Sequence, residues 1–232
     1  MISTLDHSDL QRVLDREHRS ARAQREQRQA RRQADDARGV TASRPRSFRE
    51  ANYYQHAYLS IGPAQGALLY FLARASGARR LVEFGSSFGI STLYLAAAAA
   101  DNDGIVIGSE FYANKRDHAL ANLRDAGLAA RAEIRLGDAT ETLVDIEGPV
   151  DFVFLDGEKS LYRPVLESLE NRLAEGAWVV ADNLDHLAGE PGDFRHFILN
   201  QRERYTTRLM PVGKGMFSIS QWCGGDKRVD TA

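Results

Sequence analysis

The chain has 232 residues, 43% hydrophobic and 27% charged, proportions typical of a soluble globular protein and not of a disordered or fibrous one. The formal net charge of −2 gives no general attraction to nucleic acid, and the single cysteine, Cys223, excludes an intrachain disulfide and favours a reducing compartment. The N-terminus lacks the pattern of a secretory signal and no apolar stretch is long enough to span a membrane, so we expect a cytoplasmic protein without a membrane partner.

Residues 1–47 are predicted to form an arginine-rich helical arm and a linker. Segment 8–38 contains no proline or glycine and is dominated by good helix formers. Beyond Val13 and Leu14 its only apolar residues are alanines, so we expect no apolar stripe wide enough to join a core. Arginines recur every third residue over 16–28, which is compatible with a phosphate-binding face. The favoured interpretation is a solvated arm, or a helix lying on the second subunit of a homodimer.

The domain that follows, residues 48–223, alternates between two patterns. An amphipathic helix is predicted over 61–77, with its start near Pro63. After it, strands are predicted at 79–85, 104–110, 131–137, 150–157 and 177–183, and helices between them at about 90–100, 114–127, 139–146 and 160–174. Strands that are apolar on both faces and separated by helices indicate a parallel sheet with helices on both sides, hence a Rossmann-like, doubly wound α/β fold.

This alternation stops after the fifth predicted strand. A helix near 193–201 leads into two strand-like segments, 205–212 and 215–222, which are joined by Lys214 between two glycines. Such a short, glycine-flanked connection predicts a closing antiparallel β-hairpin. Residues 224–232 form a polar C-terminal tail.

Polar or glycine residues end every predicted strand, where open α/β sheets bind their ligands. The first such end is VEFGSSFGIST, residues 82–92, in which Gly85 and Gly89 let the backbone turn tightly and approach a ligand. Its E-x-G-x-x-x-G spacing is not the G-x-G-x-x-G dinucleotide fingerprint, which argues against NAD. The alternative is a glycine-rich turn in which Glu83 makes a structural hydrogen bond.

Acidic residues end the second and third strands. Glu110 follows Glu83 by 27 residues, where an acid can accept hydrogen bonds from both hydroxyls of a ribose. Asp138 stands where it could meet an adenine amino group, and it could equally cap a helix that begins at Ala139.

The fourth and fifth strands end in LDGEK and ADN. Adjacent strands would bring Asp156, Asp182 and Asn183 together. Two carboxylates and an amide oxygen are hard ligands that suit Mg²⁺, with Mn²⁺ or Ca²⁺ as alternatives, better than zinc. The alternative interpretation is that Asp156 caps the next helix and that Asp182-Asn183 forms a turn.

The segments VEFGSSFGIST, GSEF, LGDAT, LDGEK and VVADN, in this order, resemble the metal-dependent class I S-adenosylmethionine O-methyltransferases, the family of the catechol and caffeoyl-coenzyme A enzymes and their bacterial relatives. The resemblance covers roughly residues 55–222 and implies a seven-stranded sheet whose last strand is antiparallel. It implies cofactor contacts from Glu83, Gly85, Ser86, Ser87, Gly89, Ser91, Glu110, Phe111, Asp138, Ala139 and Asp156, metal ligation by Asp156, Asp182 and Asn183, and Lys159 as the catalytic base.

The implied activity is transfer of a methyl group to a hydroxyl of a small catechol-like or otherwise vicinally oxygenated acceptor, for example a natural product. Gly157-Glu158 departs from the bulky His-Trp of the catechol enzymes, and Arg208 falls near the position of the carboxylate that holds their second hydroxyl. Both departures leave the acceptor open. The alternatives are a methyltransferase of the same fold that acts on a macromolecule, supported only by the arginine arm, and a non-catalytic scaffold that binds the cofactor.

Overall fold

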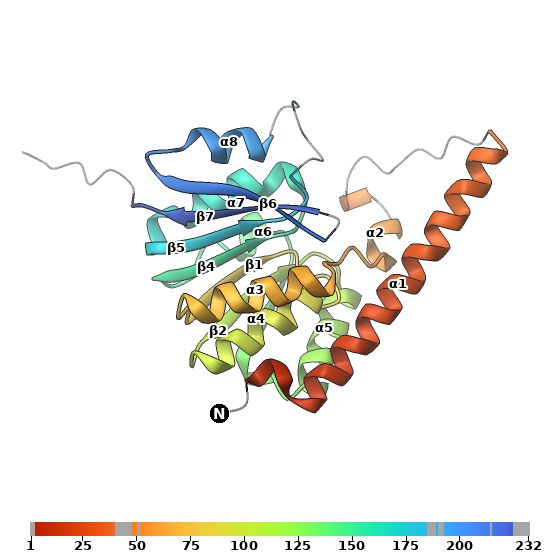
Figure 1. Ribbon diagram of the computed structural model, residues 1–232, viewed down its shortest axis with the longest axis horizontal. Helices are drawn as coiled ribbons and strands as arrows, with labels where there is room; N and C mark the ends of the chain where they lie inside the picture. The colour runs from red at the N-terminus through yellow and green to blue at the C-terminus, as the bar shows by residue number, and fades with distance from the viewer. Residues whose placement is uncertain are drawn as a thin grey trace, which may run out of the picture.

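A computed structural model of the chain describes residues 3–39, 48–50, 52–184, 189, 193–213 and 215–224. They include a seven-stranded sheet in the order β3-β2-β1-β4-β5-β7-β6, in which β7 alone runs antiparallel to its neighbours (Figure 1). The strands are β1 (Arg80–Phe84), β2 (Ile105–Glu110), β3 (Ala132–Leu136), β4 (Val150–Leu155), β5 (Leu173–Ala181), β6 (Tyr205–Val212) and β7 (Gly215–Trp222). The predicted Rossmann-like sheet with a closing hairpin is thus confirmed, although Lys214 lies outside the described residues.

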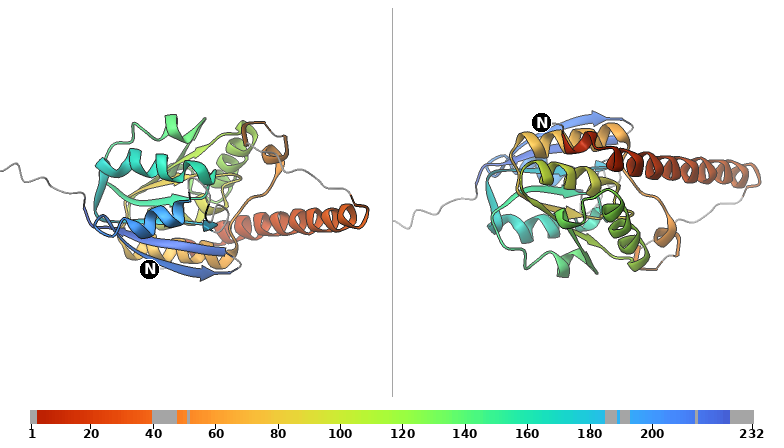
Figure 2. Two further views of the ribbon diagram at one scale, coloured as in Figure 1. Left: turned by 90° about the horizontal axis from the view of Figure 1, so that it is seen from above. Right: turned by 90° about the horizontal axis from the view of Figure 1, so that it is seen from below.

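Helices cover both faces of the sheet (Figure 2). One face carries α1 (Ser8–Ala37), α3 (Pro63–Ala75), α4 (Ile90–Asp101) and α5 (Ala113–Asp125), and the other carries α6 (Ala139–Thr142), α7 (Tyr162–Leu169) and α8 (Phe194–Asn200). The shorter elements are α2 (Asn52–His56) and the 3₁₀ turns η1 (Thr4–Asp6), η2 (Phe48–Glu50), η3 (Ala129–Arg131), η4 (Lys159–Leu161) and η5 (Glu170–Arg172).

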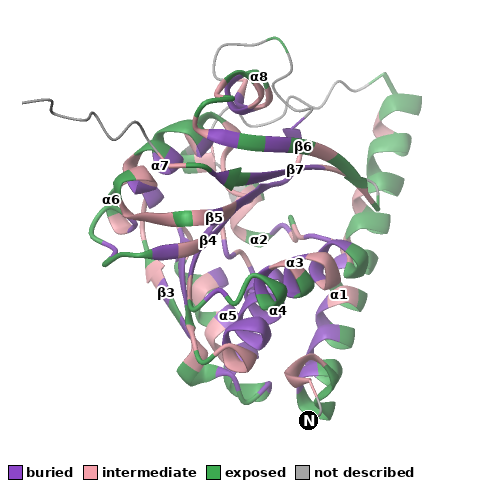
Figure 3. Cartoon of the chain, turned by 60° about the vertical axis from the view of Figure 1, so that its left-hand side comes forward, coloured by how far each residue is buried: buried purple, intermediate pink, exposed green. Residues whose placement is uncertain are grey.

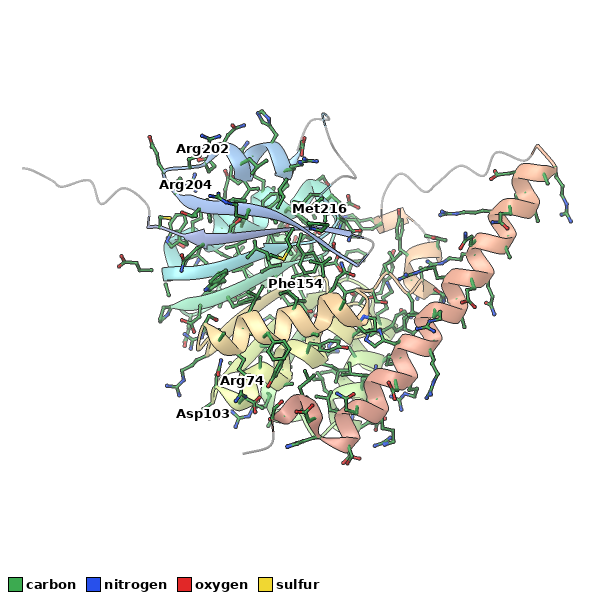
Figure 4. All side chains as sticks on the ribbon, viewed as in Figure 1. Arg74, Asp103, Phe154, Arg202, Arg204 and Met216 are labelled. Atoms are coloured by element: carbon green, nitrogen blue, oxygen red, sulfur yellow. The ribbon has the colours of Figure 1, made fainter. Side chains whose placement is uncertain are left out.

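Alternate residues of the central strands enter two separate hydrophobic cores. Phe152 and Phe154 of β4 belong to the core on the α3–α4 side (Phe154 is labelled in Figure 4). The centroid of the Phe154 ring lies 6.1 Å from that of Phe217 in β7. Val153 and Leu155, which are also fully buried, belong to the core under α7. Burial on both faces explains why these strands are almost continuously apolar.

The first half of α1 is part of the globular body, so the expectation that this helix has no stripe wide enough for the core was wrong. Leu10, Val13, Leu14 and Ala21 are at most 5% exposed and pack in the core on the α3–α5 side. Leu10 and the 13–14 pair follow the helical i, i+3, i+4 spacing, which places them on one face. From residue 22 the helix extends beyond the body with exposed or half-buried side chains (Figure 3).

Other boundaries also differ from prediction, and the helix expected over about 139–146 ends at Thr142. The helix expected over 160–174 ends at Leu169, because its buried stripe of Tyr162, Val165, Leu166 and Leu169 ends there. The following strand therefore begins early, at Leu173, which pairs with Val150 of β4. No helix in the described part of the chain is both long and apolar enough to cross a membrane. Most of the predicted linker and of the polar tail lies outside the described residues.

Candidate active site

The loop after β1 needs glycine at two positions because it is wedged between neighbouring elements. Gly85 and Gly89 have φ values of 96° and 87°, which favour glycine. A Cβ on Gly85 would lie 2.8 Å from the backbone oxygen of Asp156, and one on Gly89 would lie 2.8 Å from the Cβ of Ala119. The loop therefore runs directly against the end of β4 on one side and against α5 on the other.

Glu83, near the end of β1, holds this loop in place through hydrogen bonds. Its side chain is fully buried and accepts hydrogen bonds from the hydroxyls of Ser86 (2.6 Å) and Thr92 (2.5 Å). Burial raises the pKa of Glu83, and these hydrogen bonds lower it in part. Within this structure Glu83, Ser86, Gly89 and Ser91 shape the loop, whereas the cavity wall is formed by other members of the predicted cofactor set.

A cavity opens at the carboxyl ends of β1, β2, β3 and β4. It brings together seven of the predicted cofactor residues: Gly85, Ser87, Glu110, Phe111, Asp138, Ala139 and Asp156. The carboxylate of Glu110 is held by the backbone N–H groups of Ser87 (2.8 Å) and Tyr112 (2.9 Å), which each donate to a different oxygen. This fixed carboxylate is suited to accept hydrogen bonds from a diol.

Asp138 takes the capping role at the start of α6. Its Oδ1 accepts from the backbone N–H of Thr140 at 3.0 Å, and Oδ2 forms an ion pair with Arg49. Burial would raise the pKa of Asp138, but the Thr140 groups and the Arg49 guanidinium outweigh it, so the pKa is lowered. The cap uses Oδ1 alone, so Oδ2, which here pairs with Arg49, is the Asp138 oxygen that a ligand could share.

A segment preceding β1 covers the cavity, and α1 holds part of this cover in place. Phe48, Tyr54 and Leu59 line the cavity, and the Phe48 ring packs edge-on against Phe111 with 5.0 Å between centroids. On α1, Gln24 donates to the His56 carbonyl (2.8 Å) and accepts from the Tyr58 N–H (2.7 Å), and Arg28 donates to the Tyr58 carbonyl at 2.8 Å.

The ends of β4 and β5 bring the predicted metal ligands together. Oδ1 of Asp156 accepts from the Asn183 side-chain amide at 3.3 Å, and the backbone N–H of Asn183 donates to Oδ1 of Asp182 at 2.7 Å. Oδ2 of Asp182 accepts from Gln65, at the start of α3, at 3.1 Å. Burial and the nearby Asp156 carboxylate raise the pKa of Asp182, although Lys159 and Gln65 oppose this.

This set of side chains fits a hard divalent cation. Two close carboxylates, of which Asp182 is 3% exposed, form a negatively charged, largely buried centre that a cation would neutralise. Asn183, whose left-handed φ of 59° turns the chain back, places its amide against Asp156. The described residues contain no cluster of three or more His, Cys, Asp or Glu, so the third ligand here would be the amide oxygen of Asn183.

Lys159 lies beside this carboxylate pair. Its Nζ donates to Oδ1 of Asp156 at 3.1 Å and to the hydroxyl of Tyr162, which in turn donates to the Asp182 carbonyl at 3.1 Å. Sequence reasoning missed Tyr162 and Gln65. The signals were present: Tyr162 follows Lys159 by three residues, and Gln65 lies three residues after Gly62, in a capping-box position.

Two positions at which the sequence departs from the catechol enzymes, Gly157 and Arg208, have clear surroundings in the structure. A Cβ on Gly157 would lie 2.3 Å from the Phe84 ring, so this ring occupies the space that a larger residue would need. Arg208 lies on the edge strand β6, donates to the Thr207 carbonyl at 2.8 Å, and does not line the cavity in the described part of the chain.

Comparisons with known proteins find methyltransferases. A family described as a methyltransferase domain matches residues 82–184. A putative O-methyltransferase of Mycolicibacterium smegmatis is 30% identical over 173 residues, which cover 68% of this chain and 81% of the relative. A catechol O-methyltransferase of Mycobacterium tuberculosis is 35% identical over 127 residues, but the chain spans only 57% of that relative's length.

Among solved structures, an O-methyltransferase of tomaymycin synthesis from Streptomyces achromogenes, in complex with S-adenosylmethionine, is 26% identical, with a TM-score of 0.65 over 80% of this chain and 93% of that one. The fold and the matched sequence together define the class as S-adenosylmethionine-dependent methyltransferases. Within that class, the chain belongs to the bacterial O-methyltransferase family related to the catechol enzymes.

Proposed function

We propose that this protein transfers a methyl group from S-adenosylmethionine to a hydroxyl of a small acceptor with two adjacent oxygens, assisted by a divalent cation. The proposal rests on the position of Asp156. Asp156 lines the cavity next to Gly85, and its Oδ1 also accepts hydrogen bonds from Lys159 and Asn183. Asp156 thus joins the cavity at the ends of β1–β4 to a set of hard oxygen ligands.

The cavity offers a matching group for each part of the cofactor. Glu110 would accept from the ribose hydroxyls, because its two oxygens are already oriented by backbone N–H groups. Phe111 and Ala139 would flank the adenine, and Asp138 would accept from its amino group. The backbone at Gly85 would lie against the methionine part, and glycine is needed there because a Cβ would meet the end of β4.

Asp156, Asp182 and Asn183 would hold the cation, with Mg²⁺ as the first choice and Mn²⁺ or Ca²⁺ as alternatives. A divalent cation bound there would lower the pKa of an acceptor hydroxyl. Bound S-adenosylmethionine would supply an activated methyl group, which would pass to the acceptor oxygen as the carbon–sulfur bond breaks, with S-adenosylhomocysteine as the leaving group. Lys159 takes the hydroxyl proton or stabilises the oxyanion at its Nζ. Placing the oxygen in line behind the methyl group supplies about 7–11 kcal/mol of the barrier.

The acceptor class follows from the number of protein ligands. Three protein ligands leave open positions in an octahedron, and two adjacent oxygens on the acceptor fill two of them at once. The aromatic cover of Phe48 and Tyr54 favours a flat acceptor. A homodimer would form through the exposed second half of α1. The single cysteine keeps a cytoplasmic location as our expectation.

Chelation tests the proposal. After dialysis against EDTA, the protein should still bind S-adenosylhomocysteine in a calorimeter but should not methylate a catechol, and added Mg²⁺ should restore turnover. A monophenol, which lacks the second oxygen, should be a poorer acceptor. An unchanged rate after EDTA treatment would disprove the metal assignment, and radioactive methyl groups that enter only macromolecules of a lysate would instead support the macromolecular alternative.

A further inference from the structure

Lys115 is a buried cation in the first turn of α5. It is only 4% exposed, and its Nζ lies 5.3 Å from the centroid of the Phe88 ring and 5.8 Å from that of Tyr112. Throughout the described residues, no oxygen hydrogen-bonds to this ammonium group and no carboxylate forms an ion pair with it. The two rings offer it their faces, which attract a cation but do not accept its N–H groups as an oxygen would.

Lys115 lines the cavity together with Glu110 and Ser87. Burial lowers the pKa of Lys115, the charge of Glu110 raises it in part, and Arg28 of α1 lowers it further. A buried ammonium without an acceptor is costly, since it has lost water and gained no hydrogen bond. A ligand oxygen in the cavity would remove that cost.

The neighbourhood of Lys115 indicates which part of a ligand this would be. Glu110 is the cavity-wall anion whose charge acts on Lys115, and it presents a carboxylate suited to the two O–H groups of a ribose. A ribose that donates both protons to Glu110 keeps lone pairs on both oxygens. Those oxygens need a donor, and Lys115 supplies N–H groups beside them.

The acceptor site is a poorer match for this lysine. Asp156, Asp182 and Lys159 follow β4 and β5, whereas Lys115 follows β2, and β1 lies between these two parts of the sheet. Phe88, on which the ammonium rests, is stacked on Tyr58 at 4.3 Å, which fixes it in the cofactor loop. Lys115 therefore belongs to the nucleoside end of the cavity.

We propose that Lys115 donates a hydrogen bond to a ribose hydroxyl oxygen of the bound nucleoside and, with Glu110, makes the cavity select a complete ribose. This rests on the proposed function only in requiring that the cavity bind the cofactor. Lys115 is thus a specificity-determining residue whose buried charge is paired only when the nucleoside is present.

The test compares wild type, Lys115→Met and Lys115→Gln by calorimetry with S-adenosylhomocysteine and with its 2′-deoxy and 3′-deoxy analogues. Lys115→Met keeps the length of the side chain but has no donor, so affinity for S-adenosylhomocysteine should fall about 10- to 100-fold, the effect of losing a charged hydrogen bond. Lys115→Gln keeps N–H donors and should recover part of the affinity. The melting temperature of Lys115→Met without ligand should equal or exceed that of wild type, because an apolar side chain replaces an unpaired buried charge.

The deoxy analogues identify the contact. In wild type, removal of the hydroxyl that faces Lys115 should weaken binding, and in Lys115→Met the same removal should cost clearly less. The inference is overturned if Lys115→Met binds S-adenosylhomocysteine as well as wild type does, if it weakens all three ligands equally, or if it melts at a lower temperature, which would assign the lysine to the fold. A wild-type protein that binds no S-adenosylhomocysteine would instead refute the proposed function.

Discussion

Replacing Glu17 should destabilise the protein in a way that depends on pH. This residue of α1 is 2% exposed, and its carboxylate accepts hydrogen bonds from the Tyr58 hydroxyl (2.8 Å), His118 Nε2 (3.0 Å) and Arg16 Nε (3.0 Å). Burial by itself would raise the pKa of Glu17, but these three donors outweigh it and lower the pKa from 4.5 to about 2. The carboxylate therefore connects α1 to the segment before α3 and to α5.

The shift sets the size of the effect. The difference between 4.5 and about 2, at about 1.4 kcal/mol for each pKa unit, corresponds to at most about 3.5 kcal/mol. Because the folded pKa is below the unfolded one, this stability is fully present above pH 4.5 and is lost as the pH falls towards 2. Glu17→Gln should therefore lower the free energy of unfolding by roughly 2–3 kcal/mol at pH 7, or the melting temperature by roughly 4–12 °C.

Urea denaturation at pH 7 and at pH 3.5 measures both parts of this prediction. The difference in the free energy of unfolding between wild type and Glu17→Gln should be smaller by about 1 kcal/mol at pH 3.5, because the unfolded carboxyl is protonated at that pH. Glu26→Gln is the matched control: this glutamate lies on the exposed part of the same helix, and its substitution should change stability by less than about 0.5 kcal/mol. The electrostatic reasoning would be contradicted if Glu17→Gln lowered the free energy of unfolding equally at both pH values, or by no more than Glu26→Gln does.

Three further substitutions test the site itself. Lys159→Ala should lower kcat about 10²- to 10⁴-fold, as expected for loss of a general base, while calorimetry finds the affinity for S-adenosylhomocysteine unchanged; a fully active variant would remove Lys159 from the mechanism. The double variant with Asp156→Ala should be scarcely slower than the slower single one in the same assay, because groups that act as a unit are not additive. Gly157→Ala should destabilise the fold by about 1–3 kcal/mol in thermal melts, since the new methyl group meets the Phe84 ring, and an unchanged melting temperature would show that the ring moves aside at little cost.

The sheet and the strand ends could be predicted because their signals are local. A parallel strand buried on both faces must be apolar at nearly every position, and Phe152 to Leu155 satisfy this condition within four residues. The ends of adjacent parallel strands meet at one edge, so Asp156 and Asp182 could be placed together before the structure was known. The roles of single atoms in this site remain predictions.

What the sequence could not show depends on contacts between distant segments. Lys115 looks like an ordinary lysine on the polar surface of a helix, and its burial depends on the loop with Phe88 and on the cavity cover with Tyr54 and Leu59. Similarly, Leu10, Val13 and Leu14 form too short an apolar stripe to predict packing, because the helices they contact come much later in the chain.

The attachment of α1 also bears on how the chain folds during synthesis. Glu17 bonds to His118 across 101 residues, and Thr4 bonds to Asp101 across 97. At about 5–20 residues per second, the partners of α1 are made roughly 5–20 s after α1 itself. During that interval Leu10 and Val13 have no core to enter, and contacts this far apart close slowly. Charged side chains such as those that dominate α1 are the kind that keep an exposed segment in solution until its core is made.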